Sequence, residues 1–197
     1  LSSSFVEYNV KEEESIVLSL DSLKQVLGRS KASDSVIFEL NEETNKLNIR
    51  FEGETKRDFN LSLLEGSNED QKVPELDFPG VVELNNFVFN EAIDDMDIIS
   101  DSIVLNLSQE GLRMEAVGNT SDAKANLIVK DGGELICPED PIKSKYSIEY
   151  LKKIAKGGKL ANNVTLKFGP DYPLQIEYLV QDKLSLMTIL APRVSND

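Results

Sequence analysis

The sequence predicts an α+β fold built from a repeated unit of one helix followed by an antiparallel hairpin or strand. Two segments, beginning at Ser19 and Ser147, match at a constant offset along the chain. A third, related unit lies between them. In all three units the apolar residues recur first with a helical period and then in the alternation typical of a half-buried strand. We therefore expect two similar domains, the first of them incomplete.

The outer two units begin with "SLDSLKQVLGRSKASDSVIFEL" and "SIEYLKKIAKGGKLANNVTLKF". In each, a serine precedes the helix and can cap it, and a glycine follows before the strand begins. The turns "NEETNK" and "GPDYP" then join Val36–Leu40 to "LNIRFEG" and Val164–Phe168 to "LQIEYLV". Their polar residues and glycine predict hairpins.

In the middle unit, one helical face carries residues at the spacing i, i+3, i+4 and i+7, namely Phe89, Ala92, Ile93 and Met96. The hairpin "SIVLNLSQEGLRMEAVG" follows, with Gly111 at a position suited to left-handed backbone, and then the strand "DAKANLIVK". Because the outer units are equivalent, the middle unit needs its own counterpart. We expect that counterpart ahead of residue 1.

The segment from Leu64 to Gly80 mixes Gly, Ser, Asn, acidic residues and proline without a period, which is typical of a linker. It divides the chain into three parts. Residues 1–64 form the C-terminal part of a first domain, residues 65–78 form the linker, and residues 79–197 form a second domain. A solvated spacer is the simplest interpretation. Apolar residues at its end instead favour docking onto a surface.

Composition excludes several classes of function. The chain has 197 residues, no histidine and one cysteine, Cys137. A single cysteine excludes an internal disulfide, and the absence of histidine excludes a Cys/His zinc site and disfavours a His-dependent hydrolase. No apolar run approaches the roughly 20 residues that span a bilayer. A net charge of −14 would ordinarily disfavour nucleic acid, so the placement of the basic residues decides that question.

Four stretches resemble the DNA sliding clamps of the proliferating cell nuclear antigen family. They are "LSLDSLKQVLGRSKASD", "DSIVLNLSQEGLRMEAVGNTSDAKANL", "YSIEYLKKIAKGGKLANNVTLKFGPDYPLQIEY" and the terminal "ILAPRV". Their order is the family's order, and together they cover nearly the whole chain. The resemblance implies the DNA-clamp fold, in which three subunits of two similar domains form a ring with helices lining the hole. It also implies that family members carry a further helix and strands before this chain's first residues.

The resemblance further implies a processivity factor that encircles double-stranded DNA without reading its sequence. It tethers DNA polymerase, flap endonuclease and DNA ligase, and a clamp loader places it on DNA. No cofactor and no catalysis are implied. The location would be cytoplasmic and DNA-associated in an archaeal protein, which we favour, or nuclear in a eukaryotic one. Both a homotrimer and a heterotrimer remain open.

Basic residues on the two equivalent outer helices are the candidates to face DNA: Lys24, Arg29, Lys31, Lys152, Lys153, Lys156 and Lys159. A solvated helix face is the alternative interpretation. The middle helix departs from the family, because it carries Glu91, Asp94, Asp95 and Asp97 and no basic residue. This departure keeps a heterotrimer in view.

The resemblance also implies a hydrophobic pocket for partner peptides under the linker, formed by Val73, Pro74, Phe78, Tyr172, Pro173, Ile189, Leu190, Ala191, Pro192 and Val194. These residues could instead seal the junction between domains. Two edge strands are implied to pair head to tail between subunits, through Arg57, Phe59 and Leu61 on one and Ala123, Ala125, Leu127 and Val129 on the other.

Two other functions remain as alternatives. One is a specialised clamp subunit, such as a checkpoint-type member or an obligate partner in a heterotrimer. The other is a carboxylate-dependent hydrolase, which the 35 acidic residues superficially permit. A glycosidase needs two acids fixed across a cleft, and a magnesium-dependent nuclease needs clustered acids. The acids from Asp94 to Asp97 point in differing directions on one helical turn and satisfy neither.

Overall fold

The computed structural model describes residues 2–12, 14–65, 76–129 and 133–193. The chain divides into two compact units, residues 9–74 and residues 75–197, the latter together with residues 1–8. In the described part, three α-helices combine with antiparallel sheets, which confirms the α+β prediction. Most of the predicted linker lies outside the described residues, so the predicted domain boundaries stay a prediction.

In the unit of residues 9–74, one helix packs on a three-stranded antiparallel sheet. The elements are α1 (Leu20–Leu27), β1 (Ser35–Asn41), β2 (Lys46–Glu52) and β3 (Lys56–Ser62), with strand order β1-β2-β3. Ser19 caps α1 as predicted, since its hydroxyl accepts from the Ser22 N–H at 3.3 Å. The buried side chains come from the central strand, and apolar residues of α1 and β3 pack around them.

The larger unit contains two sheets. The first has the order β12-β11-β10-β4-β8 and the second the order β7-β6-β5-β9. Its elements are β4 (Gly80–Asn85), α2 (Asn86–Asp97), β5 (Ser102–Ser108), β6 (Gly111–Val117), β7 (Asp122–Leu127), β8 (Leu135–Ile136), β9 (Ile142–Ser147), α3 (Ile148–Ala155), the 3₁₀ turn η2 (Lys156–Lys159), β10 (Asn163–Phe168), β11 (Leu174–Val180) and β12 (Leu184–Leu190). A 3₁₀ turn, η1 (Ser2–Ser4), is grouped with this unit.

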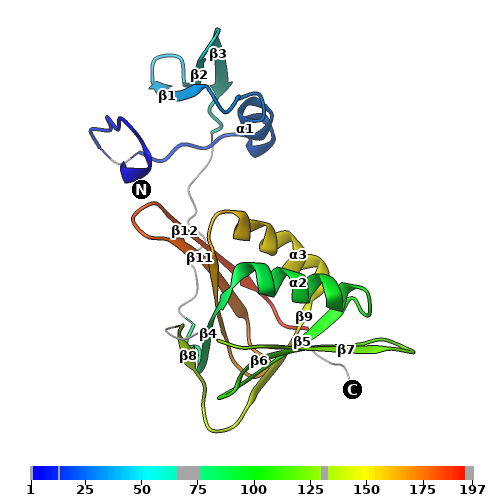
Figure 1. Ribbon diagram of the computed structural model, residues 1–197. Helices are drawn as coiled ribbons and strands as arrows, with labels where there is room; N and C mark the ends of the chain where they lie inside the picture. Colours follow the sequence, from blue (N-terminus) through cyan, green and yellow to red (C-terminus); the bar gives the residue numbers. More distant parts are fainter. Residues whose placement is uncertain (1, 13, 66–75, 130–132, 194–197) are drawn as a thin grey trace. The chain divides into compact units, whose positions relative to one another are not determined.

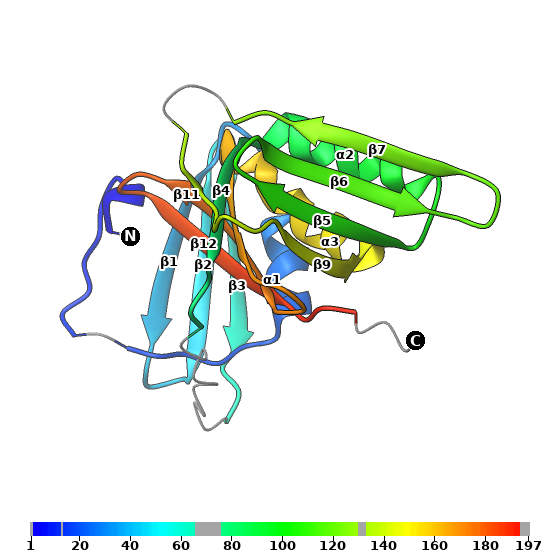
Figure 2. The same ribbon diagram turned by 90° about the horizontal axis from the view of Figure 1, so that it is seen from below.

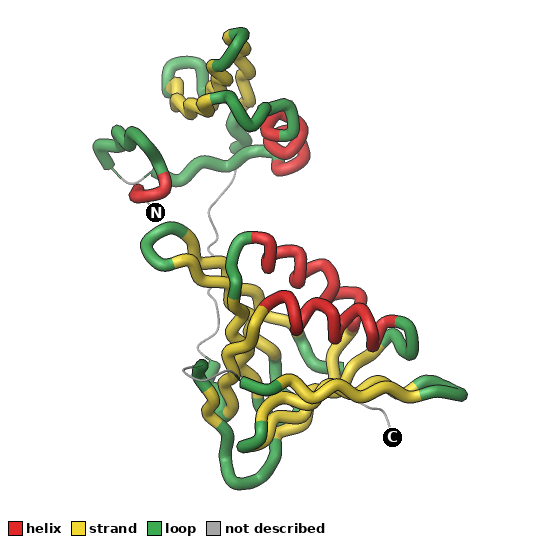
Figure 3. Tube along the Cα trace, viewed as in Figure 1, coloured by secondary structure: helices red, strands yellow, loops and turns green. Residues whose placement is uncertain are grey.

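Helices α2 and α3 lie side by side on one face of this unit (Figures 1 and 3). Seen from below, the strands β7, β6, β5 and β9 lie side by side with the two helices behind them (Figure 2). The unit's helical surface and its strands therefore face different directions. Any site on the helices is separate from one on the outer face of the sheets.

The hydrophobic core between helices and sheets follows the predicted periodicity. Phe89, Ala92, Ile93 and Met96 are all buried, which confirms the predicted inner face of α2. Gly111 has φ +126°, as its place in the hairpin predicted, and a Cβ there would lie 2.6 Å from the Leu127 carbonyl oxygen. Only glycine satisfies both conditions.

A buried polar contact joins α2 to the end of α3. The Asn86 amide donates to the Gly158 carbonyl at 2.8 Å, and a Cβ at position 158 would lie within 2.3 Å of the Asn86 side chain. In addition, the Asn90 amide donates to the Ala155 carbonyl at 3.4 Å. These bonds fix the start of one helix against the end of the other.

Ser147 occupies the N-cap position of α3, as predicted, but its side chain makes no capping hydrogen bond. It is the last residue of β9, is buried, and pairs with Ser102 of β5. The next N–H, that of Ile148, donates instead to the Asp101 carbonyl at 3.0 Å. The α3 start is thus held by the sheet, not by a side chain.

Within the described residues, no helix is both long and apolar enough to cross a membrane.

Candidate functional site

The exposed face of α3 and η2 carries the basic residues that the sequence singled out. The apolar face, including Ile148 and Leu151, is buried against the core. Consequently Lys152, Lys153, Lys156 and Lys159 all lie on the exposed side. The amphipathic pattern of the helix therefore places four ammonium groups on one solvent-facing surface.

Two of these lysines are held by carboxylates. Lys152 Nζ lies 2.6 Å from Asp97 Oδ2 and 3.4 Å from Asp94 Oδ1, both on α2. The hydrogen bond to Asp97, helped by Asp94, raises the pKa of Lys152. Lys153 pairs with Glu149 at 2.7 Å, and this hydrogen bond lowers the pKa of Glu149. Since these groups are exposed, the pairs contribute little to stability.

Lys156 and Lys159, by contrast, form no ion pair with any described residue. Their charges are open to an outside anion. The acidic residues of α2 are the departure from the family pattern. Lys152, which belongs to α3, partly neutralises them.

The basic residues of the smaller unit occur on α1 and in the loop after it. Lys24 and Arg29 line a hollow of about 360 Å³ together with Asp21, Gln25 and Gly28. Lys31 Nζ lies 3.6 Å from Glu54 Oε2 on an exposed surface. The structure therefore brings Lys24 and Arg29 together and sets Lys31 beside an acid.

Two of the residues predicted to form the peptide pocket, Phe78 and Tyr172, lie together in the larger unit. The Phe78 and Tyr172 rings meet edge to face, with centroids 5.8 Å apart. The Tyr146 hydroxyl donates to the Tyr172 carbonyl at 2.7 Å, and burial raises the pKa of Tyr146 to about 12. A neutral phenol therefore fixes the turn that carries Tyr172 at any physiological pH.

The tail residues of the pocket continue from β12. Ile189 and Leu190 pair with Gln175 and Leu174 of β11, which places them next to the turn that carries Pro173. Ala191 is exposed and Pro192 half-buried. Three predicted pocket residues, Val73, Pro74 and Val194, lie outside the described residues.

Arg193 anchors the end of this tail. Its backbone N–H donates to the Lys145 carbonyl on β9 at 2.7 Å, and its guanidinium donates to Asp101 at 2.8 Å. The tail thus leaves the five-stranded sheet and joins the edge of the four-stranded one. This anchor was not predicted from the sequence, where the one available signal was the arginine within the "ILAPRV" motif.

The two strands predicted to form subunit contacts both lie at sheet edges. On β3, Arg57, Phe59 and Leu61 are half-buried and alternate with exposed residues. On β7, Ala123 and Ala125 are half-buried and Leu127 is buried, while Val129 follows the strand and is half-buried. Each edge leaves one row of backbone groups without a neighbouring strand in the described chain.

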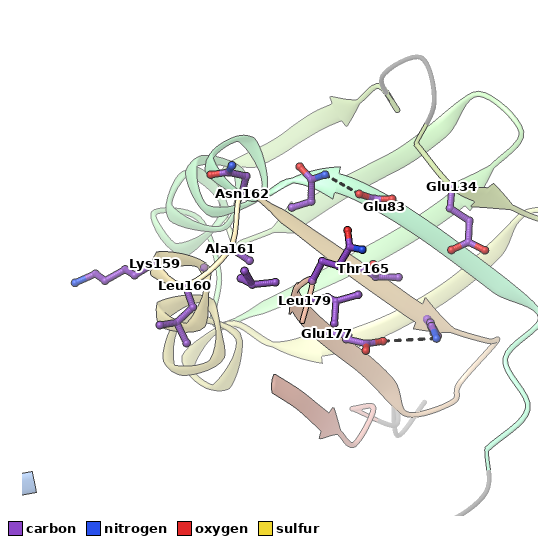
Figure 4. A pocket seen from close by; sticks show the side chains of 14 residues that line it. Glu83, Glu134, Lys159, Leu160, Ala161, Asn162, Thr165, Glu177 and Leu179 are labelled. Atoms are coloured by element: carbon purple, nitrogen blue, oxygen red, sulfur yellow. Dashed lines mark hydrogen bonds and ion pairs between the residues drawn. The ribbon is translucent and has the colours of Figure 1, made fainter. Parts of the chain in front are cut away.

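A further cavity, of about 690 Å³, lies beside the outer face of β4, β10 and β11 and was not predicted (Figure 4). In it Asn163 donates to Glu83 at 2.6 Å, and Lys167 lies 3.7 Å from Glu177. Lys159 is the predicted site residue at its rim, and its side chain points away from the cavity. No group of three or more metal-binding side chains occurs within the described residues.

Comparison with known proteins agrees with this geometry. The family model for the C-terminal domain of proliferating cell nuclear antigen matches residues 72–193. The chain belongs to the proliferating cell nuclear antigen family of sliding clamps. This confirms the resemblance that the sequence motifs indicated.

The sliding-clamp relatives extend over almost the whole chain. A DNA polymerase sliding clamp of Thermococcus gammatolerans is 38% identical over 193 residues, which are 98% of this chain and 77% of that protein. The DNA polymerase sliding clamp of Pyrococcus abyssi is 37% identical with the same coverage. The crystal structure of the proliferating cell nuclear antigen from Thermococcus kodakaraensis superposes with a TM-score of 0.85 at 28% identity, covering 96% of this chain and 77% of that one. The clamp fold is confirmed.

Proposed function

We propose that this protein, a sliding clamp and processivity factor for DNA polymerase, meets duplex DNA through the basic residues of α1 and the loop after it and of α3 and η2. The observation that carries the proposal is the exposed pair Lys156 and Lys159, which no described carboxylate neutralises in a chain of net charge −14. Lys24 of the repeat-equivalent helix α1 and Arg29 of the loop after it line a second exposed surface, which they share with Asp21.

The charge distribution suits a clamp that slides. Three such chains would carry three times the net charge of −14, which repels DNA from the outside of a ring. Exposed lysines within the ring would attract phosphates as mobile point charges and read no bases. Contact of this kind lets the duplex move past without breaking a fixed register.

Partner recruitment is proposed at the surface formed by Phe78, Tyr172 and the tail after β12. The ring contact and the Tyr146 hydrogen bond give this surface a fixed aromatic part, and the half-buried tail residues extend it. An apolar surface of this kind suits a hydrophobic plug on a visiting peptide. DNA polymerase, flap endonuclease, DNA ligase and the clamp loader are the proposed partners.

Ring closure is proposed through pairing of β3 of one subunit with β7 of the next. The side chains of the two edge strands differ in size: β3 carries Phe59 and Leu61, and β7 carries Ala123 and Ala125. Large side chains of one strand can therefore pack against small side chains of the other. A contact between two different patches closes into a ring at a fixed rotation. The acidic exposed face of α2 supports the alternative in which other, more basic subunits complete the ring.

No catalytic step and no cofactor are part of this proposal. The protein is proposed to tether its partner enzymes to DNA. In the archaeal protein that we favour, this takes place in the cytoplasm. Two carboxylates of α2, those of Asp94 and Asp97, are engaged by Lys152.

The proposal is tested on the full-length protein with a short fluorescent duplex, by binding anisotropy across a salt series. Substitution Lys156→Ala with Lys159→Ala should weaken binding and flatten the plot of log affinity against log salt by about 0.9 for each phosphate that is no longer neutralised. A charge-matched control, Lys143→Ala with Lys183→Ala, removes two exposed lysines from β9 and the β11–β12 turn. Equal effects of the two pairs would overturn the assignment to η2.

A further inference from the structure

Arg57 on β3 makes a set of contacts that an ordinary edge-strand residue lacks. Its guanidinium pairs with the Asp34 carboxylate, and Nη1 donates to the Arg29 carbonyl at 3.0 Å. The guanidinium carbon also lies 5.1 Å from the centroid of the Phe51 ring on β2. One side chain thus joins the edge strand, the central strand and the loop between α1 and β1.

That loop, residues 28–34, is closed around Asp34. The Lys31 N–H donates to Asp34 Oδ2 at 2.8 Å, and the Asp34 N–H donates back to the Lys31 carbonyl at 3.0 Å. The Asp34 side chain is only 3% exposed, so its charge depends on Arg57 for compensation. The same loop carries Arg29 and Lys31, two of the three basic residues proposed to meet DNA from this unit.

We infer that Arg57 is a positioning residue, which holds the loop of residues 28–34 so that Arg29 and Lys31 present their charges to DNA. The inference rests on the proposed DNA-facing role of that loop. Arginine suits this task because its planar fork serves the Asp34 carboxylate and the Arg29 carbonyl at once while the guanidinium lies over the Phe51 ring. A lysine supplies the charge without the fork.

Two variants separate positioning from charge. Arg57→Lys keeps the net charge and removes the forked hydrogen bonds, whereas Asp34→Asn keeps the shape and removes one negative charge. If charge alone governed DNA binding, Asp34→Asn would strengthen it. Positioning predicts that both variants weaken it and reduce the salt slope by up to about 0.9 for each of Arg29 and Lys31.

Arg50→Lys is the matched control. Arg50 on β2 pairs with Asp58 at 2.8 Å and Glu39 at 3.3 Å, on the sheet face opposite the core, and both of these partners lie on strands outside the loop. The substitution should leave the salt slope of the full-length protein unchanged. Hydrogen exchange at the Lys31 amide should rise in Arg57→Lys and Asp34→Asn, while protection across β2 persists and shows that the unit remains folded.

The double variant Arg29→Ala with Lys31→Ala separates the role of the loop from the role of Arg57. If it leaves DNA binding unchanged, the proposed DNA-facing role of the loop is wrong. If it flattens the salt slope and Asp34→Asn does not, the positioning role of Arg57 is wrong. The expected result is that Asp34→Asn flattens the slope in the natural background and has no further effect when Arg29 and Lys31 are already absent.

Discussion

At the scale of single residues, Arg193 shows how the tail after β12 is held against the edge of the four-stranded sheet. Its bond to Asp101 joins positions 92 residues apart in the chain. The hydrogen bond from Arg193 lowers the pKa of the exposed Asp101 carboxyl. A carboxyl with a lowered pKa contributes stability above the pKa of the unfolded chain, and this contribution is lost as the pH falls through the folded-state pKa.

Removal of the guanidinium in Arg193→Ala should therefore raise the pKa of Asp101 toward its ordinary value. Carbon-detected NMR titration of the side-chain carboxyl measures this directly. Lys143→Ala, which removes a charge elsewhere on β9, should leave the Asp101 midpoint unchanged. An unshifted midpoint in Arg193→Ala would show that the ion pair does not form in solution.

The motif "ILAPRV" predicted where the tail would lie but not what Arg193 would bind. Its partner belongs to the loop before β5, and no local pattern in the sequence links the two. The same holds for the Tyr146 hydroxyl and the Tyr172 carbonyl, which only the packing of β9 beside the β10–β11 turn brings together. Sequence patterns report local periodicity, whereas such contacts depend on the tertiary fold.

At the scale of elements, the pairing of α2 with α3 controls which lysines are available. Asp94→Asn with Asp97→Asn should release Lys152, because both of its carboxylate partners lose their charge. We expect tighter binding to duplex DNA and a salt slope steeper by about 0.9 for each additional phosphate that Lys152 neutralises. The assay is the same anisotropy series on the full-length protein.

The control for this change is Glu139→Gln with Asp140→Asn, which removes two exposed charges between β8 and β9. General reduction of negative charge would strengthen DNA binding equally in both pairs. A specific effect of the α2 pair assigns the increase to Lys152. Weaker binding would instead mean that these acids place Lys152 correctly.

Periodicity predicted each helix and hairpin well because a buried face must recur every 3.6 or every 2 residues. It did not distinguish two serines with different roles. Ser147 matches the capping Ser19 in sequence, yet its side chain is buried at the end of β9 and makes no capping hydrogen bond. The pairing of Lys152 with α2 was likewise invisible, since the acids of one helix and the lysine of another meet only after the helices pack.

At the scale of the whole molecule, the proposed pairing of the edge strands β3 and β7 between subunits predicts association. Light scattering of the full-length protein on a size-exclusion column should give three times the chain mass for a ring that closes on itself. A monomer or dimer that reaches ring mass only with another clamp chain would establish a heteromeric ring. Failure to associate with itself or with any clamp chain would contradict the ring assembly proposed here.

The repeat predicted the helix-and-hairpin units, and the resemblance of four sequence motifs to the sliding-clamp family implied the clamp fold. Ser19 and Ser147 begin equivalent segments, and both return as helix-strand-strand units in the structure. The pocket and subunit contacts could not be reached in the same way, because they depend on how separate surfaces meet. Those assignments stay predictions for the experiments described above.

The close approach of Gly158 to Asn86 also limits how this family member can diverge. The two positions lie 72 residues apart, yet any side chain at 158 would need the space that the Asn86 amide fills. A lineage that replaced Gly158 first would disrupt the packing of α2 on η2, and one that shortened Asn86 first would leave the Gly158 carbonyl without its donor. Descendants should therefore change both positions or neither, so the residues at positions 86 and 158 should covary among related sequences.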